Sequence, residues 1–155
     1  CVILVILQEN MMLIKIFLAI FLVIFVSVNK SIFFLTFMTV NDILGNFSIL
    51  GNNQNNSEET YKGTLSLTLD SENRIIAKWL INKSQEQFGV GFFKNNILVI
   101  NFNYQGDENT IYKGTVVYKC FNKNILEGFW SEEYGNSAFL GTENCFRIKN
   151  ELKKT

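Results

Sequence analysis

From residue 41 onward, apolar and polar side chains alternate along the chain with a period of two. In the first such run Tyr61, Leu65 and Leu69 share one face, while Lys62 and Thr64 share the other. This period is typical of a β-strand with one buried face, because successive side chains point to opposite sides of a sheet. No helical period of useful length follows residue 41. The alternation therefore predicts an all-β domain over residues 41–150.

Further runs repeat the alternation, and each has its own expected inward-facing set. These sets are Ile75, Ala77, Trp79 and Ile81; Phe88, Val90 and Phe92; Leu98, Ile100, Phe102 and Tyr104; Gly114, Val116, Tyr118 and Cys120; and Leu126, Gly128 and Trp130. A first strand is expected near residues 46–50, and the last run, at 138–148, alternates less cleanly. Short polar segments rich in Asn, Asp and Gly separate the runs and indicate hairpin turns. We predict about eight antiparallel strands in meander order, closed into a small barrel or folded into a sandwich, since both remove sheet edges.

An internal repeat supports this organisation. The segment Tyr61-Lys62-Gly63-Thr64 recurs as Tyr112-Lys113-Gly114-Thr115, and the same offset of 51 residues relates Trp79 to Trp130. Each half is therefore expected to be a strand–turn–strand unit that ends its second strand on tryptophan. Such a repeat serves packing and does not by itself indicate a function.

The first 40 residues are almost wholly apolar and form a separate segment. Because the chain opens with Cys1 while Met11 and Met12 follow, residues 1–10 are expected to be an upstream or non-native leader. Lys15 and the apolar run at 16–28 are typical of an export signal, so we expect residues 11–40 to form an apolar helix that directs export. The alternative is an uncleaved membrane anchor, because only the whole segment reaches the roughly 20 apolar residues that a span needs. Residues 151–155 are a polar tail.

Composition removes several classes of function. The chain has no histidine, and its 14 basic and 14 acidic residues leave a net charge of zero. Without imidazole there is no Ser-His-Asp triad, Cys-His pair or HExxH zinc site. The zero net charge and the lack of a basic cluster argue against nucleic-acid binding. We therefore expect no catalytic residues, no metal and no cofactor, with membrane contact only through residues 11–40.

Aromatic residues are the candidate ligand contacts. Trp79, Trp130, Tyr104 and Tyr118 lie in expected inward rows, and a small barrel can hold one apolar ligand in its interior. The competing interpretation is that these rings fill the core, which is the commoner role of inward aromatics. No polar groups are expected to converge beside them.

Two cysteines and several carboxylates complete the candidates. Cys120 and Cys145 could form a disulfide, as in many exported domains, or could be two small buried hydrophobes. The acidic pairs at 58–59, 107–108 and 132–133 are expected in solvated loops. Glu143 lies inside a strand run, where we expect it to face solvent or pair with a lysine.

The order of these motifs resembles a known family. The segment Gly45-Asn46-Phe47-Ser48-Ile49-Leu50-Gly51-Asn52, followed by Tyr61-Lys62-Gly63-Thr64, is similar to the pattern G-x-Y-x-V-x-G-x-N…Y-x-G-T of small exported bacterial proteins, some named fibronectin-binding proteins. The likeness continues through Trp79 and the segments 114–118 and 126–130 to 141–143. It implies an exported all-β domain with no known enzymatic activity. Relatives often carry a cysteine pair on the central strands, which this chain lacks.

These observations lead to one preferred function and two alternatives. We expect an exported bacterial β-domain that acts as a non-enzymatic binding or surface component, with an extracellular protein as a candidate partner. The first alternative is a carrier of a small apolar ligand in the barrel interior. The second is a carboxylate-based hydrolase, which would need one carboxylate in an apolar setting.

Overall fold

The computed structural model describes residues 15–21, 38–55, 57 and 59–149. The chain divides into two compact units, residues 1–36 and 37–155, and we describe each by itself. In the first unit residues 15–21 are helical, as the sequence predicts, and the apolar side chains of Phe17 and Phe21 are exposed. Within the described ranges, no helix is both long and apolar enough to cross a membrane. The expected leader, most of the expected export signal and the polar tail lie outside the described residues.

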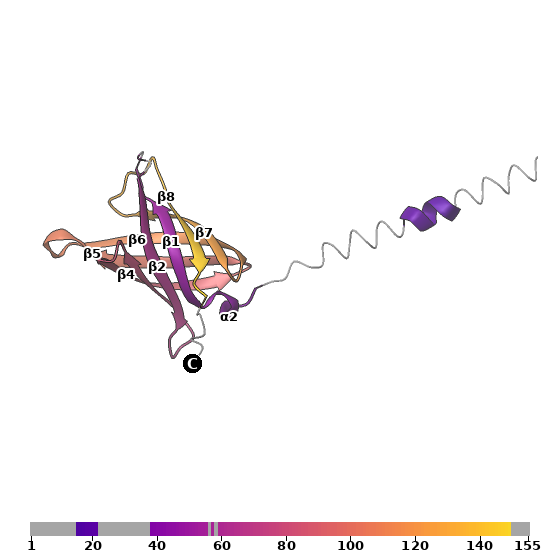
Figure 1. Cartoon of the computed structure of the whole chain (residues 1–155), viewed down its shortest axis with the longest axis horizontal. Coiled ribbons are helices and arrows are strands. Elements are labelled where there is room, and N and C mark those ends of the chain that lie inside the picture. Colours follow the sequence, from indigo (N-terminus) through magenta and orange to yellow (C-terminus); the bar gives the residue numbers. More distant parts are fainter. Residues whose placement is uncertain (1–14, 22–37, 56, 58, 150–155) are drawn as a thin grey trace, which may run out of the picture. The chain divides into compact units, whose positions relative to one another are not determined.

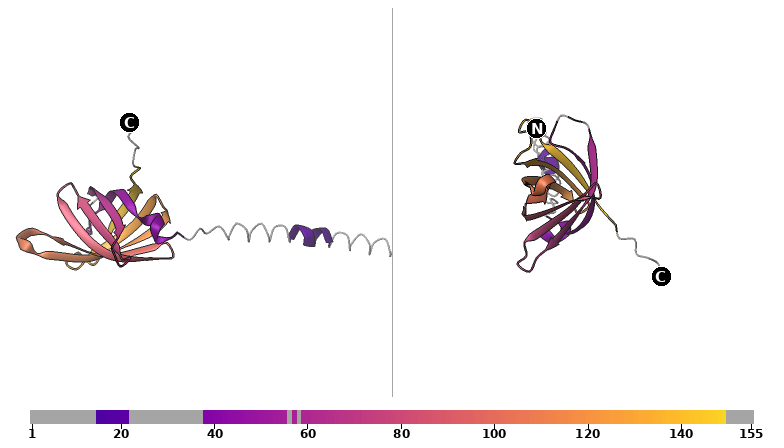
Figure 2. Two further views of the ribbon diagram at one scale, coloured as in Figure 1. Left: turned by 90° about the horizontal axis from the view of Figure 1, so that it is seen from below. Right: turned by 90° about the vertical axis from the view of Figure 1, so that its left-hand side faces the viewer.

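The second unit is a closed barrel of eight antiparallel strands (Figures 1 and 2). The strands are β1 (Gly45–Asn52), β2 (Thr60–Leu69), β3 (Ile75–Ile81), β4 (Gln85–Lys94), β5 (Ile97–Gln105), β6 (Ile111–Asn122), β7 (Ile125–Glu132) and β8 (Gly141–Arg147). Each strand pairs with the next, and β1 also pairs with β8 from Phe47–Arg147 to Asn52–Thr142. This last pairing closes the sheet, so the predicted meander forms a barrel rather than a sandwich.

Asparagine shapes the tight turns between the strands. Asn82 and Lys83 link β3 to β4 with positive φ angles of 49° and 64°, and Asn95 and Asn96 link β4 to β5 with φ of 52° and 63°. Two consecutive positive φ angles give the hairpin turn whose twist matches that of the flanking strands. Asparagine adopts this region more readily than most residues. The polar segments of the sequence are therefore the turns they were predicted to be.

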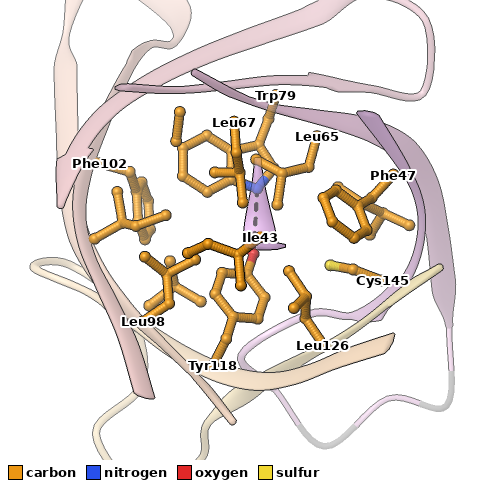
Figure 3. Close-up of a cluster of buried hydrophobic side chains, with 14 of the residues drawn as sticks. Ile43, Phe47, Leu65, Leu67, Trp79, Leu98, Phe102, Tyr118, Leu126 and Cys145 are labelled. Carbon is orange, nitrogen blue, oxygen red and sulfur yellow. Dashed lines mark hydrogen bonds between the residues drawn. The ribbon is translucent and has the colours of Figure 1, made fainter. Parts of the chain in front are cut away.

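Inward side chains form one continuous core (Figure 3). Leu65, Leu98, Tyr118 and Leu126 come from four different strands and are fully buried. Figure 3 shows them pointing toward the centre of the ring of strands, together with Phe47. Burial of this apolar surface is the main stabilisation of such a domain, at roughly 25 cal/mol per Å².

One end of the barrel is closed by the short helix α2 (Val40–Ile43), which directly precedes β1. Its Ile43 side chain is fully buried in the core. The guanidinium of Arg147, on β8, donates hydrogen bonds of 2.6 Å to the carbonyls of Asp42 and of Leu44, and a further one to the carbonyl of Lys123. The same guanidinium lies 4.6 Å from the ring centroid of Phe47. Arg147 thus ties the helix to the first and last strands.

Strand β4 differs from its predicted orientation. Phe88, Val90 and Phe92 are 45%, 49% and 63% exposed, so the expected inward set is wrong and faces outward. The inward row instead contains Gly89 and Gly91. A Cβ on Gly89 would lie 2.6 Å from Ile100 Cγ2, and one on Gly91 would lie 2.3 Å from the carbonyl oxygen of Val99. Side chains from neighbouring strands occupy that space, so hydrophobicity alone pointed to the wrong face.

Candidate functional site: a cavity in the open end of the barrel

A cavity of about 400 Å³ occupies the barrel at the end opposite α2. Its walls come from the inward rows of the strands, and its mouth from the β1–β2 loop and the ends of β3, β4 and β7. The lining residues are Asn53, Gln54, Asn55, Tyr61, Trp79, Ile81, Asn82, Gln85, Gln87, Phe102, Tyr104, Val116, Trp130, Glu132, Gly135 and Glu143. A volume in this range suits one small organic molecule.

Three aromatic side chains form one wall of the cavity. The ring centroids of Trp79 and Phe102 are 6.2 Å apart with the planes tilted by 60°, and those of Phe102 and Trp130 are 6.3 Å apart, nearly perpendicular. The pair Phe102–Trp130 has the favourable edge-to-face arrangement, and the pair Trp79–Phe102 is tilted. Figure 3 shows Trp79 and Phe102 arriving from different sides of the barrel. Because the three rings support one another, their positions are set before any ligand arrives.

A buried carboxylate forms the polar centre of the site. Glu143, on β8, is only 6% exposed. Its Oε1 accepts a hydrogen bond of 2.8 Å from the hydroxyl of Tyr61, and its Oε2 accepts one from the hydroxyl of Tyr118. The indole N–H of Trp130 donates to the Tyr61 hydroxyl at 3.0 Å. The indole N–H of Trp79 donates to the Tyr118 hydroxyl at 3.3 Å, and Figure 3 draws this bond as a dashed line. The five side chains therefore form one hydrogen-bonded chain centred on the carboxylate.

Glycines on neighbouring strands make room for the large rings of this network. A Cβ added to Gly51 would lie 2.3 Å from Tyr61 Cζ, and one added to Gly141 would lie 2.0 Å from Trp130 Cε2. Each glycine is also the cross-strand partner of the ring it faces. The glycine–aromatic pairs thus place Tyr61 and Trp130 against the barrel wall, and the cavity remains beside them.

Burial changes the acidity of every group around the carboxylate. Desolvation raises the pKa of Glu143 above its ordinary value, while the hydrogen bonds from Tyr118, Tyr61 and Trp79 act in the opposite direction. Desolvation, together with the nearby carboxylate, also raises the pKa values of Tyr61 and Tyr118. The two hydroxyls therefore remain protonated and donate to Glu143 over the whole physiological range.

The mouth of the cavity is polar, and hydrogen bonds connect the residues around it. Gln54 is buried, and its amide Nε2 donates to Ser131 Oγ at 3.0 Å and to the carbonyl of Asn136 at 3.1 Å. Its Oε1 accepts a hydrogen bond of 2.9 Å from the backbone N–H of Glu132. The hydroxyl of Tyr104 donates to Glu132 Oε2 at 2.7 Å. These bonds connect the β1–β2 loop to the end of β7 and hold the entrance in one shape.

The residues predicted as ligand contacts separate into two groups. Trp79, Trp130 and Tyr104 line the cavity, as the ligand-binding interpretation requires. Tyr118 is fully buried and is absent from the lining, so it acts from the core by holding Glu143.

Three expectations about polar groups are wrong. Glu143 neither faces solvent nor pairs with a lysine, because its place in the inward row of β8, between Gly141 and Cys145, directs it into the barrel. Polar groups do converge beside the tryptophans, through Glu143 and Tyr61. Likewise Glu132, expected in a solvated loop, ends β7 and lines the cavity. The alternation of Gly141, Glu143 and Cys145 in the sequence was the signal that could have revealed the inward carboxylate.

Cys120 and Cys145 are both buried and both free. Leu126 on β7 is the cross-strand partner of each, so one strand lies between them. Neighbouring strands are roughly 4.8 Å apart, which puts the two Cα atoms about 9.6 Å apart. A disulfide needs a Cα separation below about 7 Å. The geometry therefore fits the buried-hydrophobe alternative and not the disulfide.

Over the described residues, no group of three or more Cys, Asp or Glu side chains is arranged to hold a metal ion. The polar atoms of the cavity are carboxylates, amides and phenols.

Comparisons with known proteins support the fold alone. No family model matches the sequence, and no curated protein matches it. Among solved structures, the barrel is similar to a redesigned β-barrel, mFAP1, bound to DFHBI, with a TM-score of 0.54 and 16% identity over 70% of this chain and 97% of that one. It is also similar to EF1p2_mFAP2b bound to DFHBI, with a TM-score of 0.53 and 15% identity over 70% of this chain and 95% of that one. The chain therefore shares a β-barrel fold with these proteins.

Proposed function

We propose that this protein is an exported, non-enzymatic carrier that binds one small organic ligand in the open end of its barrel. The observation that carries the proposal is the cavity of about 400 Å³ whose aromatic wall and buried carboxylate are both held in place by the fold. The sequence favoured a binding or surface component over a carrier. An interior filled by both tryptophans would have argued against a carrier, whereas here both line an open space.

Three further points support the proposal. The structural neighbours are β-barrels bound to DFHBI, so a barrel of this size can accommodate a small ligand. The apolar segment at 11–40 and the resemblance to exported bacterial β-proteins favour export. A preformed pocket also lowers the entropic cost of binding, because few side chains need to be ordered.

The test is a fluorescence titration with the neutral aromatic probe N-phenyl-1-naphthylamine. Gln87 faces inward on β4 and lines the cavity, so Gln87→Phe should fill it and weaken binding by about tenfold or more. Asn103→Phe adds the same ring on the exposed face of β5 and is the matched control. We expect saturable one-to-one binding to the unmodified protein and to Asn103→Phe. Equal binding to Gln87→Phe, or no binding at all, would refute the cavity as a ligand site.

A carboxylate-based hydrolase is the second candidate, because Glu132 and Glu143 line the same cavity and burial raises the pKa of Glu143. A raised pKa is what a general acid needs. Hydrolysis of p-nitrophenyl glycosides that is lost in both Glu143→Gln and Glu132→Gln would establish this function. Turnover that persists in both variants, or no turnover, would exclude it.

A further inference from the structure

We infer that the ligand of this cavity is an organic cation: an ammonium group attached to a small apolar or aromatic body. The inference rests on the proposed carrier function and specifies the chemistry of its ligand. Three features of the cavity support it: the charge of its lining, the unbalanced carboxylate at its centre and the aromatic wall.

The first feature is the charge of the lining. Of the 16 residues that surround the cavity, Glu132 and Glu143 are acidic and none is lysine or arginine. The other polar contributions come from neutral amides and phenols at the mouth and floor. An anionic ligand would meet two carboxylates without a counter-charge, and such like-charge contact is strongly unfavourable in a partly dehydrated site. The lining therefore selects against anions.

The second feature is the unbalanced negative charge of the Glu143 carboxylate. Its two oxygens accept hydrogen bonds from Tyr61 and Tyr118. Among the described residues the only ion pairs join Arg74 to Asp70 and to Glu72, so Glu143 forms none. Hydrogen bonds from these neutral hydroxyls occupy acceptor positions of the carboxylate but do not cancel its negative charge. A carboxylate also has about four lone-pair positions, so each oxygen can accept a further bond. An ammonium group in the cavity would supply the charge that the protein does not.

The third feature is the wall of Trp79, Phe102 and Trp130 beside that carboxylate. Aromatic rings attract cations through their quadrupole, tryptophan most strongly, and the attraction grows when water is excluded. The same rings provide apolar surface for the body of the ligand. A neutral apolar ligand would use the rings but leave the buried carboxylate without a counter-charge, so a cation gains more from the same site.

Calorimetric titration with three probes that share one phenyl body tests the inference directly. The probes are 2-phenylethylamine, which is a cation at neutral pH, the neutral 2-phenylethanol and the anion 3-phenylpropionate. We expect the amine to bind at least about tenfold more tightly than the alcohol, and the anion not to bind measurably. Gln87→Phe should abolish binding of the amine, which assigns the signal to the cavity rather than to surface carboxylates.

Variants then identify the responsible charge. Glu143→Gln keeps the shape of the side chain and should reduce the preference of amine over alcohol to less than about threefold. Glu127→Gln, on the exposed face of β7, is the matched control and should leave the preference unchanged. The comparison of probes on the unmodified protein does not depend on either variant folding.

The outcomes separate this inference from the function on which it rests. If alcohol and amine bind equally, or the anion binds best, the cation inference is overturned while the carrier function stands. If none of the three probes binds, the carrier function fails and the inference fails with it. A preference for the amine that survives Glu143→Gln would overturn the role of the carboxylate.

Discussion

The burial of Glu143 makes the stability of the barrel depend on pH. Glu143 faces Tyr61 and Tyr118 from β2 and β6, the indoles of Trp79 and Trp130, and Cys145 on its own strand. Its pKa is raised in the folded state, mainly by desolvation. The folded protein therefore holds the proton more tightly than the unfolded chain, whose glutamates titrate near pH 4.3.

The sign of the pH dependence follows from proton linkage. The stabilisation that comes from protonated Glu143 is complete below about pH 4.3 and is lost as the pH rises through the folded pKa. We expect the free energy of unfolding of the unmodified protein, measured relative to Glu143→Gln by urea denaturation, to fall over that range and then level off. A difference that is constant or increases with pH would contradict a raised pKa.

The thiols provide a second prediction at the scale of residues. Burial raises the pKa of Cys120 to about 12 and that of Cys145 well above its ordinary value, so neither forms the reactive thiolate in the native state. In a Cys1→Ser background without reductant, we expect the thiol reagent DTNB to find almost no thiol at pH 8 and two after addition of guanidinium. A count of zero in guanidinium, restored to two by reductant, would show a disulfide instead.

At the scale of elements, the two arginines of the chain allow a matched comparison. Arg147 joins α2, β1 and the β6–β7 turn through three carbonyls and the ring of Phe47. Arg74 makes surface ion pairs with Asp70 and Glu72. Hydrogen bonds from a charged donor to backbone carbonyls stabilise more than exposed ion pairs.

We therefore expect Arg147→Met to reduce the free energy of unfolding by about 2–4 kcal/mol. Arg74→Met should cost less than about 1 kcal/mol. Urea denaturation monitored by tryptophan fluorescence measures both changes. Equal effects of the two substitutions would mean that α2 does not depend on Arg147 for its attachment to the barrel.

At the scale of the whole molecule, the N-terminal segment is proposed to direct export. When the full chain is expressed in a bacterium with a secretory pathway, we expect the barrel outside the cytoplasm, with a mass that corresponds to cleavage within residues 11–40. Replacement of Phe21 and Leu22 by lysine should interrupt the apolar run and leave the protein in the cytoplasm. Intact-mass analysis of each fraction gives the result. An exported protein of full mass would indicate an uncleaved anchor, and a cytoplasmic unmodified protein would refute the proposal.

Much of the barrel could be predicted because its local signals agree. The two-residue alternation and the asparagine turns both favour short antiparallel hairpins, and these signals are carried within each strand. Strand β4 was the exception, because its inward row is Gly89 and Gly91 while its phenylalanines face outward. Which face of such a strand is buried depends on side chains of its neighbours, such as Ile100, and that information is not local.

The sequence by itself determined the fold class, the order of the strands and the turns, because each of these depends on residues near one another in the chain. It also excluded imidazole chemistry, because the chain has no histidine. Only the tertiary structure decided that the sheet closes into a barrel with an open cavity, and that Glu143 meets Tyr61 and Tyr118 inside it. The physical reason is distance along the chain: Tyr61 and Glu143 are 82 residues apart and come together only when β1 pairs with β8. The alternation of Gly141, Glu143 and Cys145 indicates that the carboxylate faces inward, but its burial is known only once the surrounding strands that exclude water from it are placed.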